Sequence, residues 1–157
     1  MIVENDRENI LAIGTGRILS IDFGLKRIGL AMCDPFQIVA STLKTLANNN
    51  LSGVVAELCE IIKDNAVKAV VVGHPLHMTG DAGEMVSKVK EFMLQLDAAV
   101  AIKIFLWDER WTTVSAEKLL IETGKSPSKN RKKIDQLAAA FLLQGFLDRI
   151  SYLKRPA

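Results

Sequence analysis

Hydrophobic and polar residues follow two spacings along this chain, which predict strands at the start and mainly helices afterwards. Three short apolar segments come first, and we expect strands at about 17–23, 27–33 and 37–43. The links between them, 24–26 and 34–36, are short enough to join only antiparallel neighbours. The fold is therefore predicted to begin with an antiparallel meander.

The rest of the chain alternates helical and strand-like patterns. Apolar residues at helical spacing follow Asn50, and the β-branched run from Val67 to Gly73 is typical of a buried parallel strand. Asp81 and Glu84 have the spacing of a capping box that opens a second helix. The last three predicted elements are a strand at Ile102–Trp107, a helix from Thr112 or Thr113 to Gly124, and a helix at about 133–149 that follows a polar loop.

This order of elements predicts an α/β fold built on a mixed five-stranded sheet, with three antiparallel strands followed by two βα units and helices on its faces. Residues 1–16 are polar and end in Gly14-Thr15-Gly16, so we expect a flexible leader there. The length of 157 residues suits one domain, predicted over 17–152, and no repeat or linker divides it.

The composition indicates where in the cell the protein acts more than what it does. No apolar run reaches the length of about 18 residues that a membrane span needs. The acidic leader lacks the apolar core of a signal peptide, so we expect a cytoplasmic protein. Cys33 and Cys59 have no CxxC spacing and are interpreted as buried free thiols. The net charge of +2 does not indicate a partner.

Acidic residues stand at the ends of predicted elements, where sites form in α/β sheets. Asp22 closes the first strand, Asp108 and Glu109 follow the fifth strand, and Asp135 lies in the first turn of the last helix. Aspartate is depleted in strands, so a charged Asp22 needs a cation, a helix N-terminus or a metal ion beside it. Because alternate strand residues face opposite ways, only one of Asp108 and Glu109 is expected to enter a site on one face.

Three carboxylates from separate segments are a plausible cage for Mg²⁺ or Mn²⁺, which prefer oxygen ligands and assist phosphodiester hydrolysis. Other interpretations stay open on the spacing alone. Asp135 can complement the helix dipole, Asp108 or Glu109 can pair with Arg110 on the surface, and Asp22 can stabilise the turn at Gly24.

Four segments together resemble one family. They are Ser20-Ile21-Asp22-Phe23-Gly24-Leu25-Lys26-Arg27-Ile28-Gly29, Val71-Val72-Gly73-His74-Pro75-Leu76, Asp108-Glu109-Arg110 with Thr112-Thr113, and Asp135-Gln136-Leu137-Ala138-Ala139. Their order and content are similar to the YqgF/RuvX family, Holliday junction resolvase-like proteins and pre-rRNA nucleases of bacteria. The resemblance spans nearly all of 17–150.

The resemblance implies an RNase H-like fold and cytoplasmic, metal-dependent phosphodiester hydrolysis, with Mg²⁺ or Mn²⁺ as cofactor. It implies that Asp22, Glu109 and Asp135 are the catalytic metal ligands, with Asp108 the less favoured neighbour. It also links the chain to maturation of the 5′ end of pre-16S rRNA. The long leader, His74 and His77 depart from the family pattern.

Basic residues near these acids are candidates for nucleic-acid contact. Cations beside a carboxylate site attract a phosphate backbone, although a solvated loop has the same composition. Arg27 and Arg110 either bind phosphate or pair with the acids. The predicted nucleic-acid-binding residues are Arg27, Arg110, Lys125, Lys129, Arg131, Lys132 and Lys133.

Other residues carry weaker predictions. His74 and His77 flank Pro75 and lack companions with zinc-ligand spacing, so a zinc site is not favoured. Trp107 is expected in the core, and Trp111 either is partly buried or stacks on a base.

The leading functional hypothesis is a nuclease that processes the 5′ end of pre-16S rRNA. Its alternatives are a Holliday junction resolvase acting on four-way DNA and a non-catalytic RNA- or polymerase-binding module. The Asp-x-Gly corner also resembles actin-like ATPases, but those need a second domain that 157 residues cannot supply. Expected partners are structured RNA or branched DNA rather than a membrane. The protein is expected to be a monomer or a weak homodimer.

Overall fold

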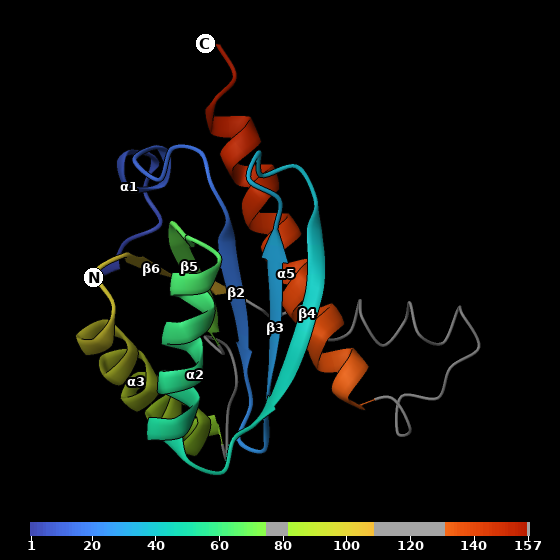
Figure 1. Ribbon diagram of the computed structural model, residues 1–157. Helices are drawn as coiled ribbons and strands as arrows, with labels where there is room; N and C mark the ends of the chain where they lie inside the picture. Colours follow the sequence, from blue (N-terminus) through green and yellow to red (C-terminus); the bar gives the residue numbers. More distant parts are fainter. Residues whose placement is uncertain (75–81, 109–130, 157) are drawn as a thin grey trace.

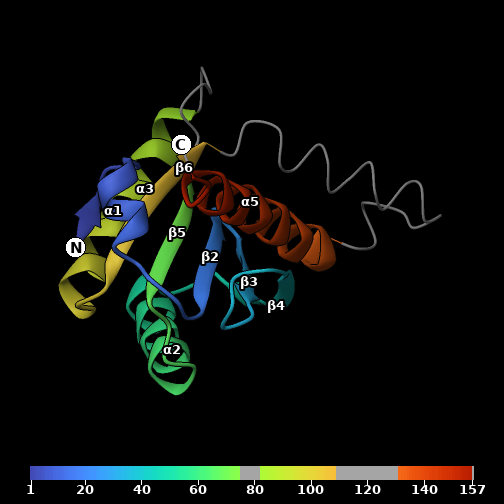
Figure 2. The same cartoon turned by 90° about the horizontal axis from the view of Figure 1, so that it is seen from above.

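The computed structural model describes residues 1–74, 82–108 and 131–156. Within these ranges one six-stranded sheet, ordered β1-β6-β5-β2-β3-β4, carries helices on both faces (Figures 1 and 2). The strands are β1 (Ile2–Val3), β2 (Ile18–Phe23), β3 (Arg27–Cys33), β4 (Ala40–Ala47), β5 (Ala69–His74) and β6 (Lys103–Asp108). The helices are α1 (Arg7–Leu11), α2 (Leu51–Asp64), α3 (Ala82–Ala99) and α5 (Arg131–Leu153).

The strand directions confirm the predicted mixed sheet. β2, β3 and β4 form the antiparallel meander, whereas β1, β6, β5 and β2 run parallel to one another. The carboxyl ends of β2, β5 and β6 therefore share one edge of the sheet. In α/β proteins such an edge is where functional sites form.

Two apolar layers cover the two faces of the sheet. One face packs against α2 and α3, and its fully buried residues include Leu19, Ile21 and Phe92. The opposite face packs against α5 and α1, and its buried residues include Phe105 and Phe146. Figure 2 shows α5 lying across the sheet on the side opposite α2.

Residues 1–16 are not the flexible leader that the sequence predicts. β1 adds a sixth strand by pairing in parallel with β6, and the Met1 amino group donates to the carbonyl of Ile102 at 2.8 Å. Asp6 caps α1 by accepting from the Asn9 backbone N–H at 2.7 Å, and Ile10 is 1% exposed. The prediction was wrong because a mainly polar segment can still contain a single apolar residue, here Ile10, that the core buries.

The strand predicted at 37–43 lies later, at Ala40–Ala47. The Asp34 carboxylate accepts hydrogen bonds from the backbone N–H groups of Phe36, Ile38 and Val39, which folds that stretch into a turn. Gln37 adopts a φ of 60° there, and its side-chain amide donates to the carbonyls of Gly14 and Gly16. Because this stretch forms a turn, β4 begins later than predicted. The hydrogen bonds of Gln37 also fix the position of the segment before β2.

Other predicted elements agree in type with the structure. The last helix is longer than predicted, Arg131–Leu153 against 133–149, and the helix predicted after Thr112 lies outside the described residues, as does Asp81. Cys33 is a buried free thiol whose pKa is raised by burial, and Cys59 is a free, partly buried thiol. Among the described helices, none has both the length and the apolar character needed to cross a membrane.

Candidate active site

Asp22 lies on the face of the sheet that α5 covers. Ser20, two residues earlier in β2, is fully buried and donates its hydroxyl to the Ala139 carbonyl of α5 at 2.6 Å. Because strand side chains alternate between faces, Asp22 projects to the same side as Ser20. Asp22 is only partly buried, since it stands near the end of β2 at the edge of the sheet.

Gly29 brings Asp135 close to Asp22. In the β2–β3 ladder, Gly29 is the cross-strand partner of Asp22. A Cβ atom on Gly29 would overlap the backbone carbonyl of Asp135 and lie 2.9 Å from its Cβ. Helix α5 therefore crosses β3 at the position that lacks a side chain, which places its acidic residue on the face of Asp22. Sequence reasoning missed this role, although an isolated glycine in a strand often marks close backbone approach.

Arg27 pairs with Asp135 from the start of β3. The Arg27 Nε atom donates to Asp135 Oδ2 at 2.9 Å, and the two side chains are 30% and 21% exposed. This contact favours the second of the two interpretations of Arg27, pairing with an acid. A carboxylate has two oxygens, so this bond to Oδ2 still leaves Oδ1 as a further acceptor.

Asp108 ends β6 on the opposite face from Asp22. Trp107 packs edge-on against Phe146 of α5, with ring centroids 5.4 Å apart, which confirms its predicted place in the core. Strand alternation then directs the next residue, the exposed Asp108, toward the α2–α3 side. Glu109 lies outside the described residues. Within the described ranges, no three acidic, histidine or cysteine side chains form a metal-binding group.

The donor set fits a hard divalent cation. Asp22 and Asp135 offer carboxylate oxygens on one face, and the missing side chain of Gly29 lets α5 approach the sheet closely beside Asp22. Carboxylate oxygen is the ligand type that Mg²⁺ and Mn²⁺ take in proteins. The residues present are therefore compatible with the predicted cofactor.

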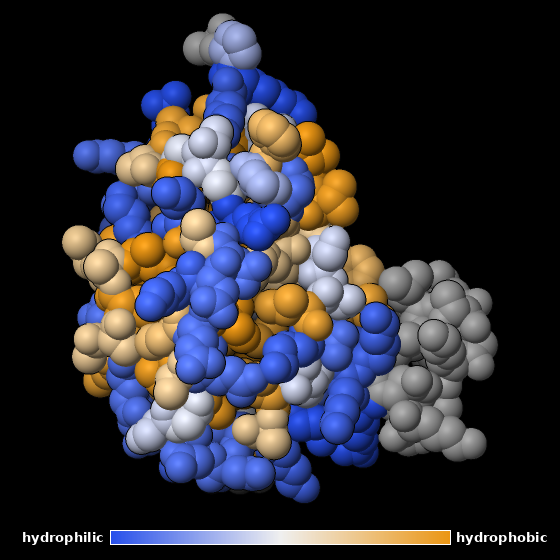
Figure 3. Space-filling view, viewed as in Figure 1, coloured by the Kyte–Doolittle hydropathy of each residue, from blue (hydrophilic) through white to orange (hydrophobic). Residues whose placement is uncertain are grey.

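The first turn of α5 presents part of the predicted basic surface. Arg131, Lys132 and Lys133 are exposed, and the Thr45 hydroxyl of β4 donates to the Lys132 carbonyl at 2.7 Å. Figure 3 shows hydrophilic side chains along the edge at which β2 ends and α5 begins. The other predicted contacts, Arg110, Lys125 and Lys129, lie outside the described residues, as do Trp111 and His77, while His74 ends β5.

Comparison with solved structures identifies the fold class. RuvC from Thermus thermophilus, solved in complex with a Holliday junction substrate, is 16% identical and superposes with a TM-score of 0.56 over 86% of this chain and 96% of that one. The fowlpox virus resolvase, solved with Holliday junction DNA, gives a TM-score of 0.54 at 13% identity over 88% and 99%. The chain thus has the RNase H-like fold of these resolvases.

Sequence comparison defines the family within that class. The family model described as "RuvX: Holliday junction resolvase" matches residues 16–149, so the chain belongs to the RuvX family. A relative from Koribacter versatilis, named "Putative pre-16S rRNA nuclease", is 40% identical over 85% of this chain and 88% of its own length. A relative of the same name from Syntrophus aciditrophicus is 38% identical over 90% and 94%. The predicted family and fold are confirmed.

Proposed function

We propose that this protein is a divalent-metal-dependent nuclease that processes the 5′ end of pre-16S rRNA in the cytoplasm. The observation that carries the proposal is the placement of Asp22 and Asp135 on one face, with Gly29 beside Asp22 in the sheet and against the Asp135 backbone. The names of the RuvX relatives supply the substrate class. Asp22, Glu109 and Asp135 are the proposed catalytic metal ligands.

Strand alternation supports Glu109 over Asp108 as the third ligand. Trp107 faces α5, so strand alternation turns Asp108 away from the side of Asp22 and Asp135, and Glu109 is proposed in its place from the family motif. When bound, Mg²⁺ or Mn²⁺ would neutralise phosphate charge and lower the pKa of water for in-line attack on phosphorus. Asp22, Glu109 and Asp135 would hold the ion, and Arg27 would orient Asp135 through its bond to Oδ2.

Basic side chains would hold the substrate backbone against this edge. Arg131, Lys132 and Lys133 lie two to four residues before Asp135 in α5 and are exposed, so they can reach phosphates of a bound strand. Arg110, Lys125 and Lys129 are proposed to extend the same contact. We propose a monomer or a weak homodimer as the acting species.

The test is a cleavage assay on two substrates in parallel, a pre-16S rRNA fragment and a four-way DNA junction, with Mn²⁺. We expect cleavage of the RNA at the precursor end, leaving a 5′-phosphate and a 3′-hydroxyl, and loss of that cleavage in Asp22→Asn and Asp135→Asn. Lys63→Gln, a change on α2 away from this edge, is the control and should retain activity. Full metal-dependent cleavage by both acidic variants would refute the assigned ligands.

Junction resolution is the second candidate, favoured by the family description and by the resolvase fold. A resolvase makes paired cuts, so it would cleave the junction symmetrically and act as a dimer. Faster cleavage of the junction than of the RNA would establish this alternative. Binding of structured RNA without cleavage in Mg²⁺ or Mn²⁺ would instead indicate a binding module.

A further inference from the structure

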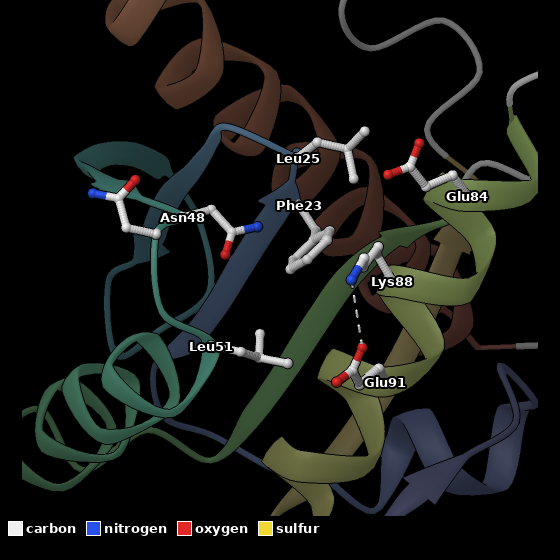
Figure 4. Close-up of a pocket in the computed structure, with 8 residues that line it drawn as sticks. Phe23, Leu25, Asn48, Leu51, Glu84, Lys88 and Glu91 are labelled. Atoms are coloured by element: carbon white, nitrogen blue, oxygen red, sulfur yellow. Dashed lines mark ion pairs between the residues drawn. The ribbon is translucent and has the colours of Figure 1, made fainter.

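A cavity of about 270 Å³ opens on the α2–α3 side of the sheet, at the edge where β2 ends (Figure 4). Its walls come from three places: the end of β2 with the following turn, the link between β4 and α2, and the first half of α3. Of the candidate metal ligands that the structure describes, neither Asp22 nor Asp135 lines it. The cavity therefore lies on the same edge of the sheet as Asp22 and Asp135 but on its opposite face.

One side of the cavity is apolar. Phe23 is 4% exposed and stacks on Phe92 with ring centroids 4.8 Å apart, so its ring is held in place. Leu25 and Leu51 complete this side, and Figure 4 shows their side chains and the Phe23 ring directed at a common space. Such a surface suits a flat, weakly hydrated group such as a nucleobase.

The other side is polar, with the amides of Asn48 and Asn49 and three charged side chains of α3. The ammonium group of Lys88 lies 4.0 Å from Glu91 Oε2, and Glu84 lies one turn before Lys88 on α3. An ammonium group only donates hydrogen bonds and a carboxylate only accepts them. Because the two carboxylates exceed the single ammonium in charge, this lining opposes a phosphate group and favours a neutral ligand that carries both donors and acceptors.

We propose that this cavity binds a guanine base of the RNA strand, an inference that rests on the proposed nuclease function. Guanine carries the acceptors O6 and N7 beside the donors N1–H and N2–H₂, and lysine pairs well with O6 and N7. Lys88 is assigned to O6 or N7, and Glu91 to the N1–H and N2–H₂ groups. Adenine lacks O6 and the N1–H donor, and uracil has only one ring N–H, so both fit this donor and acceptor order less well.

The position of the cavity connects it to the candidate active site. Phe23 follows Asp22 directly in β2, and the two side chains project to opposite faces of the sheet. An RNA strand passing over this edge would place a phosphodiester on the α5 side and a neighbouring base on the α2–α3 side. Such a base must be unstacked, as in the recognition of single-stranded RNA. The nuclease would thus prefer a guanine near its cleavage site.

The first experiment measures binding without cleavage, by NMR titration of the protein in EDTA with guanosine and with adenosine. Guanosine should shift the backbone signals of residues around Phe23 and Lys88 and bind at least tenfold more tightly than adenosine. Glu91→Gln should remove that preference, whereas Glu57→Gln, on the exposed face of α2, should leave it unchanged. Equal binding of both nucleosides, or signal shifts elsewhere only, would overturn the proposal.

The second experiment tests whether the cavity binds guanine within RNA or only the free nucleoside. It also distinguishes failure of the base site from failure of the proposed nuclease function. Single-stranded RNA tetramers with one guanine should bind more tightly than matched adenine tetramers, and a preference for guanosine without one for these tetramers would overturn the assignment to RNA. Metal-dependent RNA cleavage that is unaffected by replacing every guanine near the cut would overturn the base site alone. Guanine binding in the cavity by a protein that cleaves no RNA would overturn the proposed function alone.

Discussion

Gly29 of β3 lies against the backbone of Asp135 in α5, so closely that a methyl group at position 29 would overlap the Asp135 carbonyl. The same glycine is the cross-strand partner of Asp22. One residue without a side chain therefore sets how closely α5, which carries Asp135, approaches the sheet beside Asp22. The geometry of the proposed site depends on this contact.

Gly29→Ala should destabilise the protein and displace the start of α5. The atoms in the way are backbone atoms, which cannot rotate aside, so we expect a loss of about 1–3 kcal/mol in the free energy of unfolding. Urea denaturation measures it. Gly83→Ala is the matched control, because a Cβ atom there meets nothing within 4 Å. Equal stability of Gly29→Ala and the wild type would contradict the close approach.

The Arg27–Asp135 ion pair should contribute measurably to stability. Both side chains are less than one-third exposed and joined at 2.9 Å, so a double-mutant cycle with Arg27→Gln and Asp135→Asn should give a coupling of about 0.2–1 kcal/mol. Asp135→Asn should accordingly lose some stability together with catalysis. The more exposed Lys44–Glu57 pair provides the comparison and should couple less. Zero coupling between Arg27 and Asp135 would remove the proposed orienting role.

Ser20→Ala should weaken the packing of α5 on β2. The buried hydroxyl donates to the Ala139 carbonyl at 2.6 Å, and loss of such a bond costs about 0.5–1.5 kcal/mol. Thermal and urea unfolding measure the change. Ser41→Ala, at an exposed position of β4, is the control and should stay within about 0.5 kcal/mol of the wild type. A Ser20→Ala protein as stable as the wild type would show that this bond is not needed.

Asp34 should make stability depend on pH. Backbone N–H groups of Val39, Ile38 and Phe36 hold the pKa of Asp34 below its ordinary value. The folded state therefore gains stability above the pKa of the unfolded chain, and this gain disappears as the pH falls through the lower pKa of the folded state. In urea denaturation at pH 7, the wild type should have a larger free energy of unfolding than Asp34→Asn. This difference should shrink below about pH 4. A difference independent of pH would contradict the assignment.

The sequence predicted most of the element types, because helix and strand periodicities persist over many residues. Val67–Gly73 and 27–33 predicted strands close to β5 and β3, and the family motifs predicted the RNase H-like fold. β1 was missed because its two residues gain their partner only from β6, a hundred positions later. β4 was misplaced because the turn around Gln37 depends on side-chain hydrogen bonds to Gly14 and Gly16.

The candidate site was likewise predicted from the sequence only in part. By itself, the sequence determined which carboxylates end a strand or begin a helix, because local pattern fixes where an element stops and which face a residue takes. Only the tertiary structure decided that Asp22 and Asp135 share a face, that Arg27 pairs with Asp135, and that Lys88 and Phe23 line one cavity. These relationships join residues far apart along the chain. They arise from how α5 and α3 pack on the sheet, which local periodicity does not encode.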